Sequence, residues 1–248
     1  MTLPRRVIWT LALSAAALLP PAVGMAGALS VSPVRVHLSD QQRTAAVTLY
    51  NGGGEATLVQ VEALLWEQVE GEDRLTPTRD VIVSPAVFTL AEGKSQLVRL
   101  SLRRAADPGR ELAYRLILQE VPAAQDVQPS GLRVALRMSL PIFVAPPGEA
   151  APALEWAAIC CEGDALALEV TNNGTRHARL TDFAVTAPDQ AEPFATQKLA
   201  AYILPGQSRR WLLETEQDHV TAFAATRLAL EGHTEDGPVS AEIPVSGP

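Results

Sequence analysis

The chain has 248 residues and a formal net charge of −8 at pH 7, with 28 acidic and 20 basic side chains. An acidic chain of this kind is a poor candidate for binding nucleic acid. Its length allows one large β domain or two domains of about 100 residues each, and either can bury a core without disulfide or metal staples.

The first 28 residues have the pattern of a secretory signal peptide. Arg5 and Arg6 precede an apolar run from Val7 to Leu19, and small residues follow at 22–28. The run is shorter than the roughly 20 apolar residues that a membrane-spanning helix needs, and no later stretch of the sequence approaches that length. We therefore expect an exported, periplasmic protein without direct membrane insertion.

Turn-forming residues recur at short intervals after the signal segment, and alternating apolar residues fill the stretches between them. This pattern predicts an all-β fold built from sandwich domains. Residues 51–54 and 70–73 are expected as loops. The expected strands of the first half are 29–38, 44–50, 57–66, 81–83, 87–90, 95–102, 113–121 and 131–144.

A Pro-rich segment without alternation, residues 146–153, predicts a stiff linker. It separates an N-terminal domain, residues 29–145, from a C-terminal domain, residues 154–248. Each has the size of an immunoglobulin-like sandwich. The expected strands of the second domain are 154–159, 165–171, 178–185, 209–215, 226–231 and 239–245.

The segment 131–144 carries the strongest pattern of the chain, because every second residue from 132 to 140 is bulky and apolar. In a strand these side chains share one face. Pro141 lacks the N–H that a central strand needs, which predicts an edge strand. The residues alone leave two alternatives open: an ordinary sandwich strand with a core face, or an edge that adds a strand to a partner. The apolar side chains are those of Leu132, Val134, Leu136, Met138 and Leu140.

Two arginines interrupt apolar strands. Arg35 lies in the first expected strand, and Arg115 lies in the strand 113–121. An arginine is rarely buried without a partner, and its planar fork suits a carboxylate. Each side chain is therefore either part of a solvated face or internal ion pair, or a guanidinium held ready for a carboxylate.

The sequence shows no catalytic or metal-binding pattern. The four histidines lack the spacing of zinc ligands, and the glycine cluster 52–54 lacks the Lys-Ser/Thr of a phosphate loop. We therefore expect a non-enzymatic protein without metal or cofactor. The adjacent Cys160 and Cys161, whose redox state stays open, support one less favoured alternative, a secreted thiol oxidoreductase, although the spaced Cys-x-x-Cys motif is absent.

Several motifs follow one another in the first domain: Ser32-Pro33-Val34-Arg35-Val36, Ser84-Pro85-Ala86-Val87-Phe88, Tyr114-Arg115-Leu116-Ile117-Leu118 and the alternating strand. In this order they resemble the periplasmic pilus-assembly (fimbrial) chaperones of the chaperone–usher pathway. The residues of these motifs are most similar to those of the archaic, spore-coat-type branch. The resemblance is strong in the first domain and weak in the second.

The resemblance implies two immunoglobulin-like sandwich domains in a boomerang arrangement. It also implies a chaperone that stabilises pilin subunits by donor-strand complementation and delivers them to an outer-membrane usher for pilus assembly. The five alternating apolar residues from Leu132 to Leu140 would bind pilin, and their face is expected to be exposed or self-paired in the free protein. A structural alternative is a pilin or adhesin component itself, which would begin with a free donor extension.

One departure concerns the anchor for the pilin's C-terminal carboxylate. In one branch of the family, a Lys of the donor strand joins an Arg of the first strand in binding this carboxylate. Arg35 matches that Arg, but Pro141 stands at the Lys position. The resemblance therefore makes Arg115 the candidate replacement in the anchor.

Overall fold

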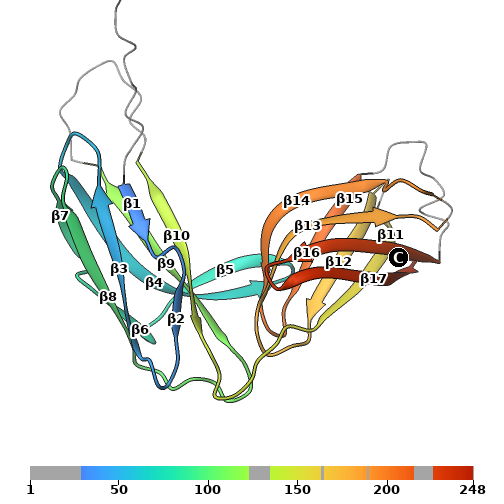
Figure 1. Cartoon of the computed structure of the whole chain (residues 1–248), viewed down its shortest axis with the longest axis horizontal. Helices are drawn as coiled ribbons and strands as arrows, with labels where there is room; N and C mark the ends of the chain where they lie inside the picture. The colour runs from blue at the N-terminus through green and yellow to red at the C-terminus, as the bar shows by residue number, and fades with distance from the viewer. Residues whose placement is uncertain (1–28, 123–134, 163–164, 189, 215–225, 248) are drawn as a thin grey trace, which may run out of the picture.

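The computed structural model describes residues 29–122, 135–162, 165–188, 190–214 and 226–247. These residues form two lobes of β-strands that meet at an angle (Figure 1). The described part of the chain contains no helix, and so it has no helix that could cross a membrane. The expected signal segment 1–28 lies outside these residues.

Two facing sheets form the N-terminal lobe. One has the strand order β1-β3-β8-β6, and the other has the order β2-β10-β9-β4-β5 with β7 also paired to β4. Buried apolar side chains from both sheets pack into one core, as expected for a sandwich. The strands are β1 (Leu29–Ser32), β2 (Val36–Leu38), β3 (Thr44–Asn51), β4 (Thr57–Val69), β5 (Glu72–Pro77), β6 (Val81–Ser84), β7 (Val87–Leu90), β8 (Ser95–Leu102), β9 (Leu112–Val121) and β10 (Arg137–Val144).

The C-terminal lobe has its own core and the strand order β14-β13-β16-β17-β11-β12-β15. A short parallel pairing of β11 with β17, at Ala158 and Ile159, joins the two halves of this order. The strands are β11 (Leu154–Glu162), β12 (Ala165–Asn172), β13 (Ala178–Thr186), β14 (Ala195–Ile203), β15 (Ser208–Glu214), β16 (Arg227–Thr234) and β17 (Gly237–Ser246).

The structure corrects the sequence prediction at four elements, one of which is strand β5 (Glu72–Pro77), where no strand is expected from the sequence. The strand expected at 29–38 is split, since β1 pairs with β3 in one sheet and β2 pairs with β10 in the other. The break falls at Pro33, which has no N–H to continue a ladder. The loop expected at 70–73 is a tight hairpin turn of Glu70 and Gly71, both with positive φ. Strand β14 is missing from the prediction because Thr196-Gln197-Lys198 gives it no apolar alternation.

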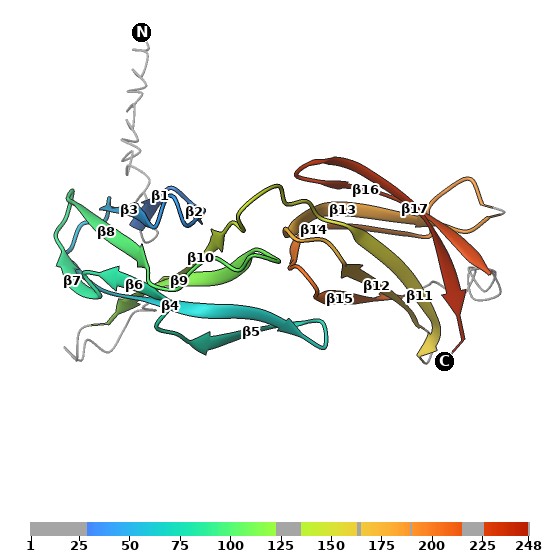
Figure 2. The same cartoon turned by 90° about the horizontal axis from the view of Figure 1, so that it is seen from below.

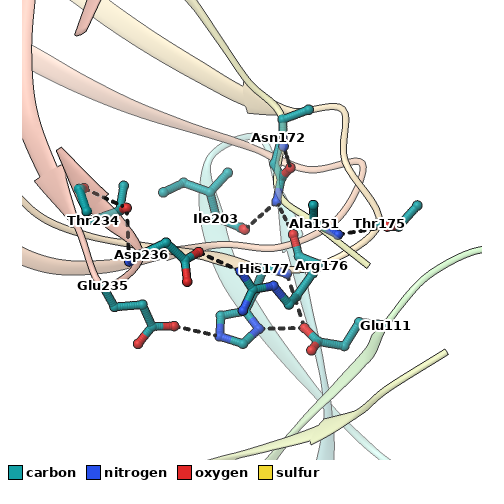
Figure 3. Close-up of polar contacts among 12 residues, drawn as sticks. Glu111, Ala151, Asn172, Thr175, Arg176, His177, Ile203, Thr234, Glu235 and Asp236 are labelled. Atoms are coloured by element: carbon teal, nitrogen blue, oxygen red, sulfur yellow. Dashed lines mark hydrogen bonds and ion pairs between the residues drawn. The ribbon is translucent and has the colours of Figure 1, made fainter. Parts of the chain in front are cut away.

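A buried asparagine shapes the equivalent turn of each lobe, Asn51 in the first and Asn172 in the second. In both turns the side-chain oxygen accepts a hydrogen bond from the N–H two residues later. The side-chain amide nitrogen donates to the carbonyl four residues later and to the carbonyl of the last residue of a strand that is distant in the sequence. For Asn172 these partners are Gly174 N at 3.0 Å, and Arg176 O at 2.7 Å and Ile203 O at 3.0 Å, which Figure 3 shows. For Asn51 they are Gly53 N, Glu55 O and Leu90 O.

Candidate functional site: the open edge of β10 and the cleft between the lobes

Strand β10 lacks a second neighbour over much of its length. It pairs with β9 from Arg137 to Val144, but with β2 only from Ile142 to Val144. The described residues therefore leave the backbone edge from 137 to 141 without a strand partner. The predicted edge strand is confirmed there, whereas the last three residues of β10 are central.

The apolar face of β10 emerges gradually from the N-terminal core. Leu140 is 4% exposed and belongs to that core, Met138 packs partly against it, and Leu136 is half-buried. The alternation is as predicted, since Ala135 and Ser139 are exposed on the other face. The expectation of an exposed apolar face is wrong for Leu140, because its side chain fills the core of its own lobe. Leu132 and Val134 lie outside the described residues.

The backbone pairing with β9 continues one step beyond β10. The N–H of Leu136 donates to the Glu120 carboxylate at 2.8 Å, and the N–H of Glu120 donates to the carbonyl of Leu136 at 2.9 Å. The half-buried Leu136 is thus held beside β9 at the place where the apolar face leaves the core.

Arg35 lies between β1 and β2 and reaches the C-terminal lobe. Its Nη1 lies 2.8 Å from Oε2 of Glu235, and its Nη2 donates to the hydroxyl of Tyr202 at 3.2 Å. Burial opposes the charge, but the hydrogen bonds to Glu235 and Tyr202 outweigh it and raise the pKa of Arg35. Of the two alternatives for Arg35, the structure shows the internal ion pair.

Arg115 lies on β9, directly opposite Pro141 of β10 in the strand register. Its guanidinium carbon lies 3.5 Å from the ring centroid of Trp66, in cation–π contact. Burial lowers the pKa of Arg115, and nearby Arg209 acts in the same direction, whereas the charge of Asp73 opposes this shift. Among the described side chains, no carboxylate lies within ion-pair distance of Arg115.

The interface between the lobes brings the two predicted arginines to one aromatic ring. The guanidinium carbon of Arg35 lies 5.8 Å from the ring centroid of Tyr202, that of Arg115 lies at 5.6 Å, and that of Arg179 lies at 5.7 Å. Sequence reasoning missed Tyr202, because it comes from the other lobe and no local pattern marks it. Three guanidinium groups therefore lie around Tyr202, and that of Arg35 is paired with Glu235.

The C-terminal end of β10 is packed at the same interface. Phe143 stacks on the ring of His177 from the C-terminal lobe, with the centroids 3.7 Å apart and the planes at 8°. Trp66 and Tyr202 pack at 6.2 Å and 5.6 Å from Phe143. One end of β10 is therefore buried between the lobes, while the other end is open.

His177 links two carboxylates across the interface (Figure 3). Its Nδ1 lies 2.6 Å from Oε1 of Glu111 in the N-terminal lobe, and its Nε2 lies 3.1 Å from Oε1 of Glu235. The His177 and Glu111 side chains are only 3% and 5% exposed. Together with the Arg35 contact, this makes a continuous polar chain from Glu111 through His177 and Glu235 to Arg35.

The β4–β5 hairpin forms a second contact between the lobes, and it projects toward the C-terminal lobe in both views (Figures 1 and 2). The amide of the buried Gln68 donates to the carbonyl of Tyr202 at 2.7 Å and accepts from the N–H of Leu204 at 3.0 Å. Arg209 donates to the carbonyl of Gly71 at 3.2 Å. Polar contacts at two separate places thus hold the two lobes in a defined orientation relative to each other.

A comparison with protein families finds a match, which covers the N-terminal lobe. Residues 28–150 match the family model of the pili and flagellar-assembly chaperones, PapD N-terminal domain. A search of curated proteins finds no match.

Solved structures cover most of the chain. The archaic CsuC–CsuE chaperone–tip adhesion subunit complex of Acinetobacter baumannii has a chain that is 21% identical, with a TM-score of 0.68, covering 89% of this chain and 100% of that chain. The YadV chaperone is 18% identical, with a TM-score of 0.60, and the match covers 86% of this chain and 98% of that chain. The complex of SafA pilin with the SafB chaperone of Salmonella enterica has a chain that is 15% identical, with a TM-score of 0.57. This match covers 87% of this chain and 96% of that chain. These likenesses confirm the predicted all-β fold of two immunoglobulin-like domains.

Proposed function

Since the chain belongs to the pili and flagellar-assembly chaperone family, we propose that it is a periplasmic chaperone that binds pilin subunits by donor-strand complementation and delivers them to an outer-membrane usher. The observation that supports this most directly is the open edge of β10, which has an apolar face that runs out of its own core. A partner strand can pair there through backbone hydrogen bonds while it covers the apolar side chains.

The proposed pilin-binding side chains are those of the strand predicted from sequence, with different roles along it. Leu136 and Met138 are half-buried and can gain burial against a partner. Leu140 is already buried and supports the strand from its own core. Leu132 and Val134, outside the described residues, continue the same alternation in the sequence.

The proposed anchor for the pilin's C-terminal carboxylate is Arg115 together with Arg35. Arg115 stands opposite Pro141, and cross-strand neighbours lie about 5 Å apart at Cβ. It can therefore supply a positive charge beside the position where Pro141 has none. Its guanidinium has no carboxylate partner among the described residues, whereas that of Arg35 is paired with Glu235. We therefore expect Arg115 to contribute more to the anchor.

The proposed function needs no catalysis, cofactor or metal, because strand pairing and burial supply the binding free energy. The alternative of a pilin or adhesin component receives no support from the N-terminal lobe, where β10 completes a six-stranded sheet. The side chains of Cys160 and Cys161, on which the thiol oxidoreductase alternative rests, lie outside the described side chains.

Recovery of a pilin complex tests the proposed function. We expect the chaperone, tagged at its C-terminus and expressed in the periplasm with a pilin subunit of its own cell, to co-purify with that pilin in equal amounts. Without the chaperone the pilin should be degraded or aggregated, since its sandwich is incomplete. Pilin that accumulates equally well in the absence of the chaperone would contradict the proposal.

Alanine at Arg115 is expected to weaken pilin binding by at least about 30-fold, because losing one partner of a buried charged contact costs about 2–5 kcal/mol. Arg35→Ala should have a smaller effect on pilin binding. The measurement is the affinity of each purified variant for pilin, with a thermal melt of each free protein. Arg99→Ala, at an exposed position of β8, is the control. If Arg115→Ala lowers the melting temperature without changing the affinity, Arg115 is structural.

A further inference from the structure

We propose that Glu235 is an internal occupant of the Arg35 anion site, which the C-terminal carboxylate of a pilin displaces when it binds. This inference rests on the proposed function and adds a residue that sets the affinity of the anchor. Glu235, a residue of the C-terminal lobe, would therefore control how tightly the anchor binds the pilin carboxylate.

The backbone of Glu235 is fixed in the turn between β16 and β17. Its N–H donates to the carbonyl of Arg179 at 3.0 Å. Within the turn, the hydroxyl of Thr234 donates to the carbonyl of Gly237 at 3.0 Å and accepts from the N–H of Asp236 at 3.2 Å. Because the turn is held on both sides, the carboxylate is presented to the cleft from a defined position.

The two carboxylate oxygens of Glu235 have different partners. Oε2 contacts Arg35 at 2.8 Å, and Oε1 contacts His177 at 3.1 Å. His177 is itself held by Glu111. With a proton on Nε2 of His177, Glu235 can release Arg35 and still keep a buried hydrogen-bond partner. An internal occupant needs this property, because otherwise its release would leave an unpaired charge at a position where its own side chain is only 20% exposed.

The surroundings of the Arg35 guanidinium favour displacement of Glu235 by the pilin carboxylate over binding of both carboxylates at once. Nη1 of Arg35 is occupied by Glu235 and Nη2 by Tyr202. A second carboxylate on the same guanidinium would lie close to Glu235, where two like charges repel strongly in a partly buried site. The positive charge that stays available to the incoming group is that of Arg115, whose guanidinium carbon lies 5.6 Å from the ring centroid of Tyr202.

The test is the affinity of the Glu235→Gln variant for the pilin. The substitution keeps the side-chain shape but removes the competing charge, so we expect about tenfold tighter binding than in the wild-type protein. The gain should disappear with a pilin extended by three residues beyond its natural C-terminus, because the carboxylate then no longer lies at the anchor. Glu235→Asp, which shortens the side chain away from Arg35, should also bind more tightly.

Glu111→Gln is the matched control, because Glu111 contacts His177 from the other side and has no contact with Arg35. It removes a charge from the same polar chain, but it should not tighten binding. Weaker or unchanged binding by both Glu235 variants would overturn the inference, and so would a gain that persists with the extended pilin. If the wild-type protein binds neither form of pilin, the proposed function itself fails.

Discussion

Replacing Leu136 with arginine is expected to abolish recovery of a pilin complex while the chaperone stays folded. The half-buried Leu136 lies where the apolar face leaves the core. Burying a Leu side chain contributes about 1.5–3 kcal/mol, and the variant would instead bury a guanidinium without a partner. The two effects together should reduce the affinity by more than about 100-fold. The measurements are co-purification from the periplasm and a thermal melt of the free protein.

Ala135→Arg is the matched control for this substitution. Ala135 is adjacent, exposed and on the opposite face of the strand, so the same charge there should leave pilin recovery unchanged. Leu140→Arg is a poor test, because Leu140 is part of the core and its substitution would unfold the N-terminal lobe. Recovery of pilin by Leu136→Arg at wild-type yield would show that the donor-strand assignment is wrong.

Asn172→Ala is expected to cause the largest loss of stability in the C-terminal lobe. The fully buried amide of Asn172 satisfies two carbonyls and two N–H groups, and alanine would leave all of them without a partner. A buried polar group without a partner costs about 1–3 kcal/mol. The variant should lose about 3 kcal/mol or more, a fall in melting temperature of roughly 10 °C for a chain of this size.

The neighbouring Asn173→Ala is the control for the loss at Asn172. Its amide donates at 2.7 Å to the Glu155 carboxylate in an exposed contact, and such contacts contribute little. We expect a change in melting temperature of about 2 °C or less. Equal losses from Asn172→Ala and Asn173→Ala would contradict the role assigned to the buried amide.

The sequence predicts those strands whose side chains alternate, because alternation is a local property. It predicts β10 for this reason, and it misses β14, which forms through pairing with β13 rather than through its own pattern. The burial of Leu140 could not be predicted either. An apolar face looks the same in sequence whether it packs in its own core or against a partner.

The anchor arginines illustrate the same limit at the site. Arg35 and Arg115 are recognisable because a charge within an apolar strand is unusual. Their partners are not, since Glu235 and Tyr202 belong to the other lobe and meet the arginines only through the packing of the two lobes. Whether a guanidinium is free or paired depends on contacts that no local pattern contains.

The hydrogen bonds of the chain segment before β11 show where an isolated C-terminal lobe must begin. The carbonyl of Ala151 accepts from the N–H of Thr175 at 2.9 Å, and the N–H of Ala153 donates to Asn172 at 3.0 Å. At Gly174 an added Cβ would lie 2.3 Å from the Ala151 carbonyl oxygen, so this packing requires glycine. A fragment that starts at Leu154 would therefore lose part of its own turn, whereas one that starts at Ala150 would keep these contacts.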